Sequence, residues 1–207
     1  MKKILIHGSG HKAASWNKVI SYMKNDKDIQ YPDLSKILNG KEASYSNLYS
    51  SFVEYCNKID DKIDLCGLSL GGILALNYAI DFPNKVNSLV LIGTPHKVPK
   101  VIFSIQNIIF KLLPKRLFET MAFNKKDTFI LGKSMKNIDF SNRVQNVKCP
   151  TLIICGEKDN SNIKSAHYLA ENIKNAKLEI IKNAGHIINE EKPEELSELL
   201  NEFWKKR

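Results

Sequence analysis

No segment of the 207-residue chain is apolar for long enough to cross a lipid bilayer as a helix. The apolar run near the start covers only Ile4 to Ile6 and ends at His7, which is too short for the core of a secretory signal peptide. We therefore expect neither a membrane-spanning segment nor a stable membrane association. Without a targeting signal, a cytoplasmic location is the expectation.

Cysteine is also scarce, and no pattern of metal-binding or phosphate-binding residues is visible. The chain has four cysteines, none of them in a C-x-x-C pair. Cys66 and Cys155 fall inside apolar, strand-like runs, where thiols are usually buried and reduced. The sequence contains no metal-ligand cluster and no P-loop, so we expect neither a metal ion nor an organic cofactor.

The positive charge is not concentrated in any one part of the chain. Lys and Arg number 31 against 22 for Asp and Glu, which gives a formal net charge of +9. The basic residues are scattered, without alternating aromatic residues or an RNP-like or zinc-finger pattern. Scattered lysines usually solvate a surface, so we expect no nucleic-acid partner. A composition of 43% hydrophobic and 26% charged residues is typical of a globular protein.

Apolar runs of strand length alternate with segments of helical periodicity along most of the chain. The predicted strands are residues 2–6, 29–34, 62–66, 86–92, 151–155 and 178–181. The predicted helices are residues 13–23, 48–59, 73–80, 165–173 and 193–204, and residues 35–47 are predicted to form a polar loop. This alternation predicts one α/β domain, residues 1–207, with a mostly parallel sheet of about six strands flanked by helices.

A nucleophilic serine is indicated by Gly67-Leu68-Ser69-Leu70-Gly71, which fits the pattern G-x-S-x-G. An apolar strand precedes it and an apolar helix follows, the context in which this pattern forms a sharp turn. Side chains two positions from the serine would collide inside such a turn, and Gly67 and Gly71 are expected to remove those collisions. The turn would lift the Ser69 hydroxyl above the sheet and direct the first N–H groups of the helix at a developing oxyanion.

Such a serine needs a general base, and the base needs an acid that fixes its tautomer. His186 follows the strand 178–181, and Asp159 follows the strand 151–155. Both are therefore expected on loops at the carboxyl edge of the sheet, where Ser69 also lies. Glu157 is the rival acid, but it lies two residues nearer to the strand. The sequence thus predicts a triad of Ser69, Asp159 and His186.

The other histidines are candidates for lesser roles. His7 is expected to shape the first loop with its ring, and His167 to lie on a surface helix. His11 and His96 are expected on loops, either as ordinary loop histidines or as substrate contacts.

A dinucleotide site is the alternative suggested by the first glycine-rich loop. Gly8-Ser9-Gly10 with Ala13 fits G-x-G-x-x-A after the first strand, and Asp33 lies near the position of a ribose-binding acid. This oxidoreductase hypothesis would leave the G-x-S-x-G turn, Asp159 and His186 without a role, so the hydrolase hypothesis explains more of the sequence.

The motifs resemble those of α/β-hydrolases over nearly the whole chain: HGSG followed by Trp16, the GLSLGG turn, PTLIICGEKD and NAGHIINEEKPEEL. The order Ser69, Asp159, His186 is also the order in which α/β-hydrolases carry their triad. The resemblance implies an α/β-hydrolase fold and a serine esterase-like or thioesterase-like activity. It also implies an oxyanion hole made of the main-chain N–H groups of Ser9 and Leu70.

The regular alternation stops at residues 96–147, where several helix-like stretches follow one another without a convincing strand. This pattern predicts a short helical insertion after the fourth strand. Its apolar residues could form a packed helix, or a lid that lines an acyl or alkyl pocket above Ser69. They comprise one face of residues 98–113, with Leu117, Phe118, Met121 and Phe123.

The chain departs from the family because Asp33 is not followed by a glycine-rich GxGxS loop, which leaves the pocket near residues 34–47 undefined. The resemblance implies an acyl-enzyme mechanism on a small to medium carboxylic ester or thioester. The scaffold also suits carbon–carbon lyases or hydrolases, peroxidase-like acyl enzymes and non-catalytic ligand-binding signalling proteins, so these functions stay open. The oligomeric state has no signature in the sequence.

Overall fold

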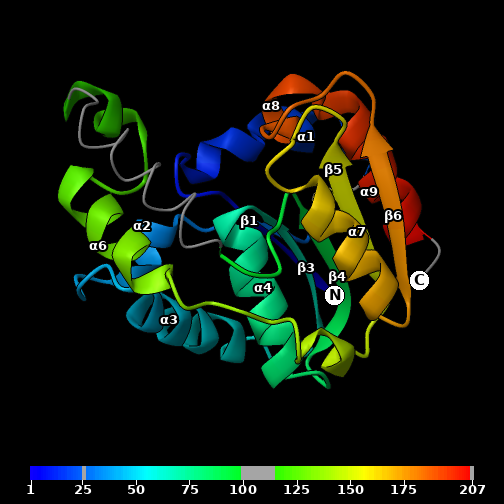
Figure 1. Ribbon diagram of the computed structural model, residues 1–207, viewed down its shortest axis with the longest axis horizontal. Coiled ribbons are helices and arrows are strands. Elements are labelled where there is room, and N and C mark those ends of the chain that lie inside the picture. The colour runs from blue at the N-terminus through cyan, green and yellow to red at the C-terminus, as the bar shows by residue number, and fades with distance from the viewer. Residues whose placement is uncertain (25–26, 99–114, 206–207) are drawn as a thin grey trace.

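The computed structural model describes residues 1–24, 27–98 and 115–205, and its central element is one six-stranded sheet (Figure 1). The strands run in the order β2-β1-β3-β4-β5-β6, and all neighbouring pairs are parallel. Their carboxyl ends therefore lie along one edge. The strands are β1 (Lys2–Ile6), β2 (Ile29–Gln30), β3 (Ile63–Leu68), β4 (Val86–Ile92), β5 (Thr151–Gly156) and β6 (Ala176–Ile181).

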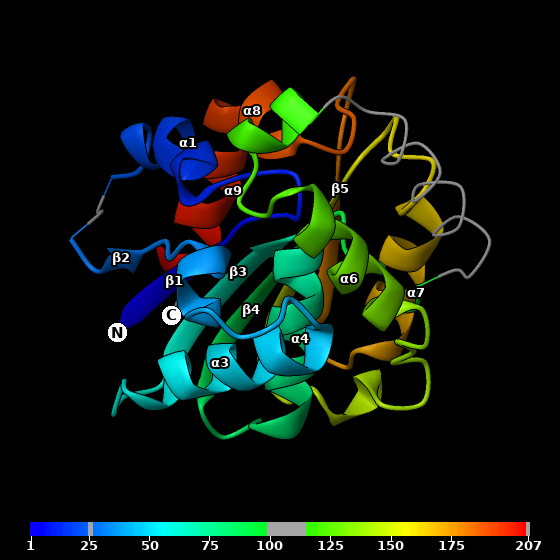
Figure 2. The ribbon, with the colours of Figure 1, turned by 90° about the vertical axis from the view of Figure 1, so that its left-hand side faces the viewer.

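Helices cover both faces of the sheet, which confirms the predicted fold class (Figures 1 and 2). Successive residues of a strand point to opposite faces, so Leu65 and Cys66 belong to two separate apolar cores. The first core lies under α3 (Tyr45–Asn57), α4 (Leu70–Asp81) and α7 (Ile163–Asn172). The second lies under η1 (Ala13–Trp16), α1 (Asn17–Ser21), α8 (Ile188–Glu191) and α9 (Pro193–Lys205).

The prediction of a polar loop at residues 35–47 is wrong, because a short helix, α2 (Leu34–Leu38), occupies part of this segment. Asp33 caps this helix by accepting a hydrogen bond from the Ser35 amide at 3.0 Å, and two leucine side chains of the helix are buried. The second strand is also shorter than predicted, with two residues. Pro32, which follows it, has no N–H group with which to extend the pairing.

The insertion after β4 begins and ends at the same place. The Val98 amide donates to the carbonyl of Ile138 at 2.9 Å, and the Phe140 amide donates to the carbonyl of His96 at 2.9 Å. We call these paired segments, residues 96–98 and 138–140, the neck. The helix predicted at 98–113 lies outside the described residues apart from Val98. The described elements here are η2 (Lys115–Thr120), α6 (Lys125–Met135) and η3 (Val144–Asn146).

All four cysteines are free and buried, Cys66 and Cys155 as the sequence predicted. Burial raises the pKa of the Cys66 thiol above its usual range and raises the pKa of Cys155 to about 12. These thiols are therefore protonated and unreactive at neutral pH. Among the described helices, none has both the length and the apolar character that crossing a membrane requires.

Candidate active site

Ser69 lies in a strained turn between β3 and α4, with φ 55° and ψ −112°. A positive φ is uncommon for a residue with a side chain. A Cβ atom at Gly67 would collide with the backbone of Gly71, and one at Gly71 would collide with the backbone of Ile6. The turn thus tolerates only glycine at these two positions. Helix α4 begins at Leu70, earlier than predicted, so the Leu70 N–H lies in its first turn.

The turn after β1 lies directly beside Ser69, since a Cβ atom at Gly8 would be 3.5 Å from the Ser69 Cβ. The His7 ring fixes this turn, as the sequence predicted. Its Nδ1 lies 2.8 Å from the Gly8 carbonyl oxygen, and its Nε2 accepts a hydrogen bond from the Leu34 amide at 3.0 Å. These partners require the hydrogen on Nδ1. Burial lowers the pKa of His7, so the ring is neutral. Ser9 follows Gly8 in the same turn.

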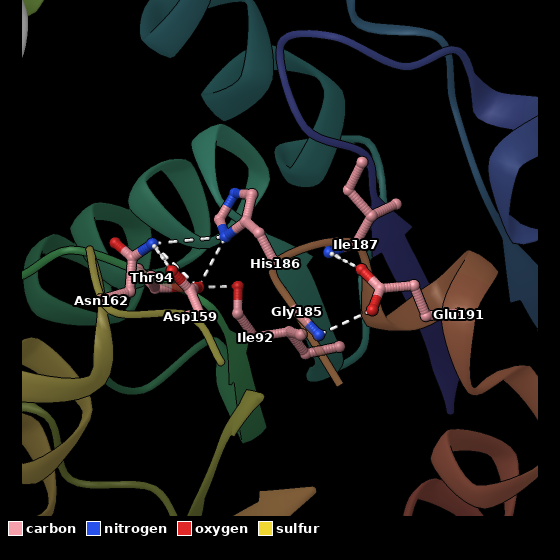
Figure 3. A network of polar contacts seen from close by, with 8 residues as sticks. All are labelled: Ile92, Thr94, Asp159, Asn162, Gly185, His186, Ile187 and Glu191. Atoms are coloured by element: carbon pink, nitrogen blue, oxygen red, sulfur yellow. Dashed lines mark hydrogen bonds and ion pairs between the residues drawn. The ribbon is translucent and has the colours of Figure 1, made fainter. Parts of the chain in front are cut away.

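His186 and Asp159 form a close pair, with Nδ1 and Oδ2 at 2.7 Å (Figure 3). The Asp159 side chain is 3% exposed and the His186 side chain 38%. Burial alone would raise the pKa of Asp159, but hydrogen bonds from His186 and Asn162 and the charge of His186 outweigh it and lower the pKa. The carboxylate is therefore ionised and accepts the Nδ1 hydrogen, which leaves Nε2 as the basic nitrogen. Glu157, the rival acid, instead accepts a hydrogen bond from the Asn183 amide at 2.9 Å.

Asn162 is the third member of this polar group. Its Nδ2 lies 2.9 Å from each carboxylate oxygen of Asp159 and 3.2 Å from the His186 Nδ1. Sequence reasoning missed it, because an Asn just before a helix is ordinarily a capping residue.

Glu191 holds the backbone on both sides of His186. Its carboxylate accepts a hydrogen bond from the Gly185 amide at 2.6 Å and one from the Ile187 amide at 3.1 Å (Figure 3). Hydrogen bonds to an ionised acceptor are stronger than neutral ones. This contact was not predicted either, since no sequence pattern shows that α8 folds back onto the loop before it.

The end of β4 joins these parts into one site. The Ser69 amide donates to the carbonyl of Ile92 at 2.9 Å. The next residue, Gly93, has φ 50°, and a Cβ atom there would lie 2.9 Å from the His186 Nδ1 and 3.2 Å from the Asp159 Oδ2. The structure thus brings Ser69, Asp159 and His186 to the carboxyl edge of the sheet.

The remaining histidines occupy different surroundings. His11, beside the β1 turn, has its Nε2 3.7 Å from a Glu190 carboxylate oxygen, and burial lowers its pKa. His96 is buried in the neck with its Nδ1 3.0 Å from the Ser165 hydroxyl, and burial lowers its pKa as well. His167 is exposed on α7, as predicted. Across the part of the chain that the structure describes, no three His, Cys, Asp or Glu side chains cluster as metal ligands.

Two known proteins match most of the chain in sequence. A putative 2-succinyl-6-hydroxy-2,4-cyclohexadiene-1-carboxylate synthase from Bacillus subtilis is 22% identical, over 97% of this chain and 89% of the relative. A pimeloyl-[acyl-carrier protein] methyl ester esterase from Wigglesworthia glossinidia brevipalpis is 29% identical, over 75% of this chain and 74% of the relative.

A solved structure of a thermophilic esterase from Thermogutta terrifontis shares the fold, with a TM-score of 0.81 and 19% identity. The similarity covers 100% of this chain and 90% of that structure. The family profile described as alpha/beta hydrolase fold matches residues 4–132, which is more than half of the chain. The chain therefore belongs to the alpha/beta hydrolase fold family.

Proposed function

We propose that the protein is a serine hydrolase that cleaves a small to medium carboxylic ester or thioester through an acyl-enzyme on Ser69. The observation that carries this proposal is the buried, ionised Asp159 bonded to His186 Nδ1, on the sheet edge that also holds the strained Ser69. The esterase among the relatives supports the same class of reaction.

The reaction begins when the Ser69 Oγ attacks the substrate carbonyl carbon and the His186 Nε2 takes the hydroxyl proton. The tetrahedral intermediate collapses, the carbon–oxygen or carbon–sulfur bond breaks, and the leaving alcohol or thiol receives the proton from His186. Water then attacks the acyl carbon with His186 again as base. The carboxylic acid departs, and Ser69 regains its proton.

The oxyanion of each tetrahedral intermediate would accept hydrogen bonds from the main-chain N–H groups of Ser9 and Leu70. The position of Gly8 against Ser69 supports this role for the turn after β1. The Leu70 amide belongs to the first turn of α4, where N–H groups have no partner within the helix. Donors fixed before the reaction stabilise the charge that develops in the transition state.

Residues 96–147 would form a helical lid within a single domain of residues 1–207. Two contacts tie this insertion to the turn after β1: Lys12 Nζ donates to the carbonyl of Glu119 at 2.8 Å, and the Ala122 amide donates to the carbonyl of His11 at 3.2 Å. Phe118 and Phe123 of the insertion are buried. An apolar lid next to the turn after β1 would suit an acyl or alkyl group.

A second candidate function is favoured by the synthase among the relatives: carbon–carbon bond cleavage or elimination on a metabolic intermediate, with the same serine and histidine. This candidate predicts a Ser69 that reacts with fluorophosphonates but shows no turnover on esters or thioesters of any chain length. The proposed esterase should turn over several members of such a panel many times.

The test of the proposal is Ser69→Ala, assayed with p-nitrophenyl acetate and butyrate. We expect kcat/KM to fall at least about a thousandfold, because the nucleophile is lost while the fold is kept. Ser50→Ala, on the exposed surface of α3, is the matched control and should keep wild-type turnover. A fluorophosphonate probe should label the wild type and the control but not Ser69→Ala. Undiminished turnover by Ser69→Ala would refute the assignment.

A further inference from the structure

Asn162 occupies the capping position of α7 without capping it. It is the residue just before the helix, where an Asn side chain usually accepts a hydrogen bond from an amide of the first turn. No such side-chain bond is made at α7. The side chain turns instead toward Asp159 (Figure 3). A local helix contact is thus forgone in favour of a contact with the candidate active site.

The Asn162 Nδ2 lies within hydrogen-bonding distance of both Asp159 carboxylate oxygens, at 2.9 Å each. The opposite orientation of the amide would set its carbonyl oxygen against those oxygens, which would repel it, so the nitrogen must face Asp159. The 3.2 Å approach to His186 Nδ1 joins two donors once Nδ1 carries its hydrogen. The approach of Asn162 to His186 is therefore a packing contact and not a hydrogen bond.

Asn162 supplies what water would supply to an exposed carboxylate. Asp159 is buried, and a buried carboxylate needs donors that remain in place. With Asn162 held on both oxygens, rotation of the carboxylate away from His186 would break those contacts. The orientation that accepts the Nδ1 hydrogen is thereby favoured.

We propose that Asn162 is a positioning residue: it holds the Asp159 carboxylate so that His186 keeps its hydrogen on Nδ1 and presents Nε2 to Ser69. This inference rests on the proposed serine hydrolase function. Asn162 acts through Asp159 and does not touch the substrate. Its loss should therefore reduce the rate of the chemical step and leave substrate binding nearly unchanged.

The test compares Asn162→Leu, which keeps the shape without polar atoms, with Asn162→Asp, which keeps the shape but replaces the donor by an acceptor. With p-nitrophenyl acetate at pH 8, we expect kcat of Asn162→Leu to fall about tenfold, the loss of a hydrogen bond to a charged group, with KM within about twofold of wild type. The rate at which a fluorophosphonate labels Ser69 should fall by a similar factor. Asn160→Leu, on the exposed part of the same turn, should keep wild-type values.

The Asn162→Asp variant separates a donor from a space-filling side chain. Two carboxylates at one site share a proton as the pH falls, and a protonated carboxyl can donate again. The ratio of kcat for Asn162→Asp to kcat for Asn162→Leu should therefore rise between pH 8 and pH 6. A constant ratio would show that a donor at this position does not restore the rate.

Two results overturn the inference: an Asn162→Leu enzyme with wild-type kcat, or a ratio that does not change with pH. If Asn162→Leu fails to fold by circular dichroism, Asn162→Ala serves as the reference in its place. A wild type that neither turns over esters nor reacts with the fluorophosphonate refutes the proposed function itself. An active wild type with an unaffected Asn162→Leu refutes only the role of Asn162.

Discussion

Glu191 stabilises the turn around His186 without touching the imidazole ring. Its two oxygens accept hydrogen bonds from the amides of Gly185 and Ile187, so one side chain fixes the peptide groups before and after His186. Each of the two amides needs an oxygen acceptor. A glutamine side chain has one oxygen and could accept from only one amide, and its NH2 group would face the other.

Glu191→Gln should therefore loosen the turn. We expect the free energy of unfolding to fall by about 1 kcal/mol and kcat to fall several-fold, because His186 is held less firmly. Urea unfolding and ester kinetics measure the two effects. Glu194→Gln, exposed in the first turn of α9, is the control and should show neither. A fully active Glu191→Gln would show that the turn is rigid without this carboxylate.

The three triad candidates could be found in the sequence, because each follows a strongly apolar strand and the shared edge of a parallel sheet collects them. Asn162 and Glu191 could not. The Asn162 side chain contacts a residue three positions earlier, and the Glu191 side chain contacts residues four and six positions earlier. Hydrophobic periodicity does not reveal the shape of the turns that make these contacts. The choice of Asp159 over Glu157 likewise depends on where the loop after β5 directs each carboxylate.

At the level of elements, β1 and α2 are joined by one buried imidazole. The His7 Nε2 accepts the hydrogen bond from the Leu34 amide only when the ring is neutral, because a proton on Nε2 would point at the amide hydrogen of Leu34. The pKa of His7 is lowered from its ordinary value of 6.5, mainly by burial. Below pH 6.5 the unfolded chain therefore binds a proton that the folded chain refuses, and the folded state loses stability as the pH falls.

The free energy of unfolding should thus decrease between pH 7 and pH 5.5, with a slope of up to about 1.4 kcal/mol per pH unit for each such histidine. His11 and His96 contribute in the same direction, since their pKa values are also lowered. His7→Gln removes one titrating group and should flatten the slope, although it lowers stability at pH 7. Urea titrations at several pH values measure this, and an unchanged slope would contradict it.

Most elements could be predicted because their apolar periodicity is strong; β4 has the bounds that the sequence predicts. The failures lie where short-range capping decides. α2 has five residues, too few for a periodic signal, and depends on Asp33 as its cap. α8 has four residues and was not predicted for the same reason.

At the level of the whole molecule, the buried thiols report on both faces of the sheet. Cys66 belongs to the core under α1 and α9, whereas Cys56, Cys149 and Cys155 belong to the core under α3, α4 and α7. All four should be inert to a thiol reagent in the native state and become reactive on unfolding.

Mass spectrometry after thiol labelling across a urea gradient should show all four cysteines becoming reactive over the same range, because both cores share one sheet. Labelling of the denatured protein in high urea provides the reference for complete reaction. If Cys66 became reactive at lower urea than the other three, the two helical layers would unfold separately.

The neck separates the insertion from the sheet. Its two antiparallel hydrogen bonds join the segment that leaves β4 to the segment that returns toward β5, so the positions of these two segments do not depend on the length of the chain between them. The entropy of closing a loop grows only slowly with its length, so a longer or shorter segment can be joined there at little cost. A change in the length of the segment that the neck encloses should therefore leave the sheet edge with Ser69, Asp159 and His186 as it is.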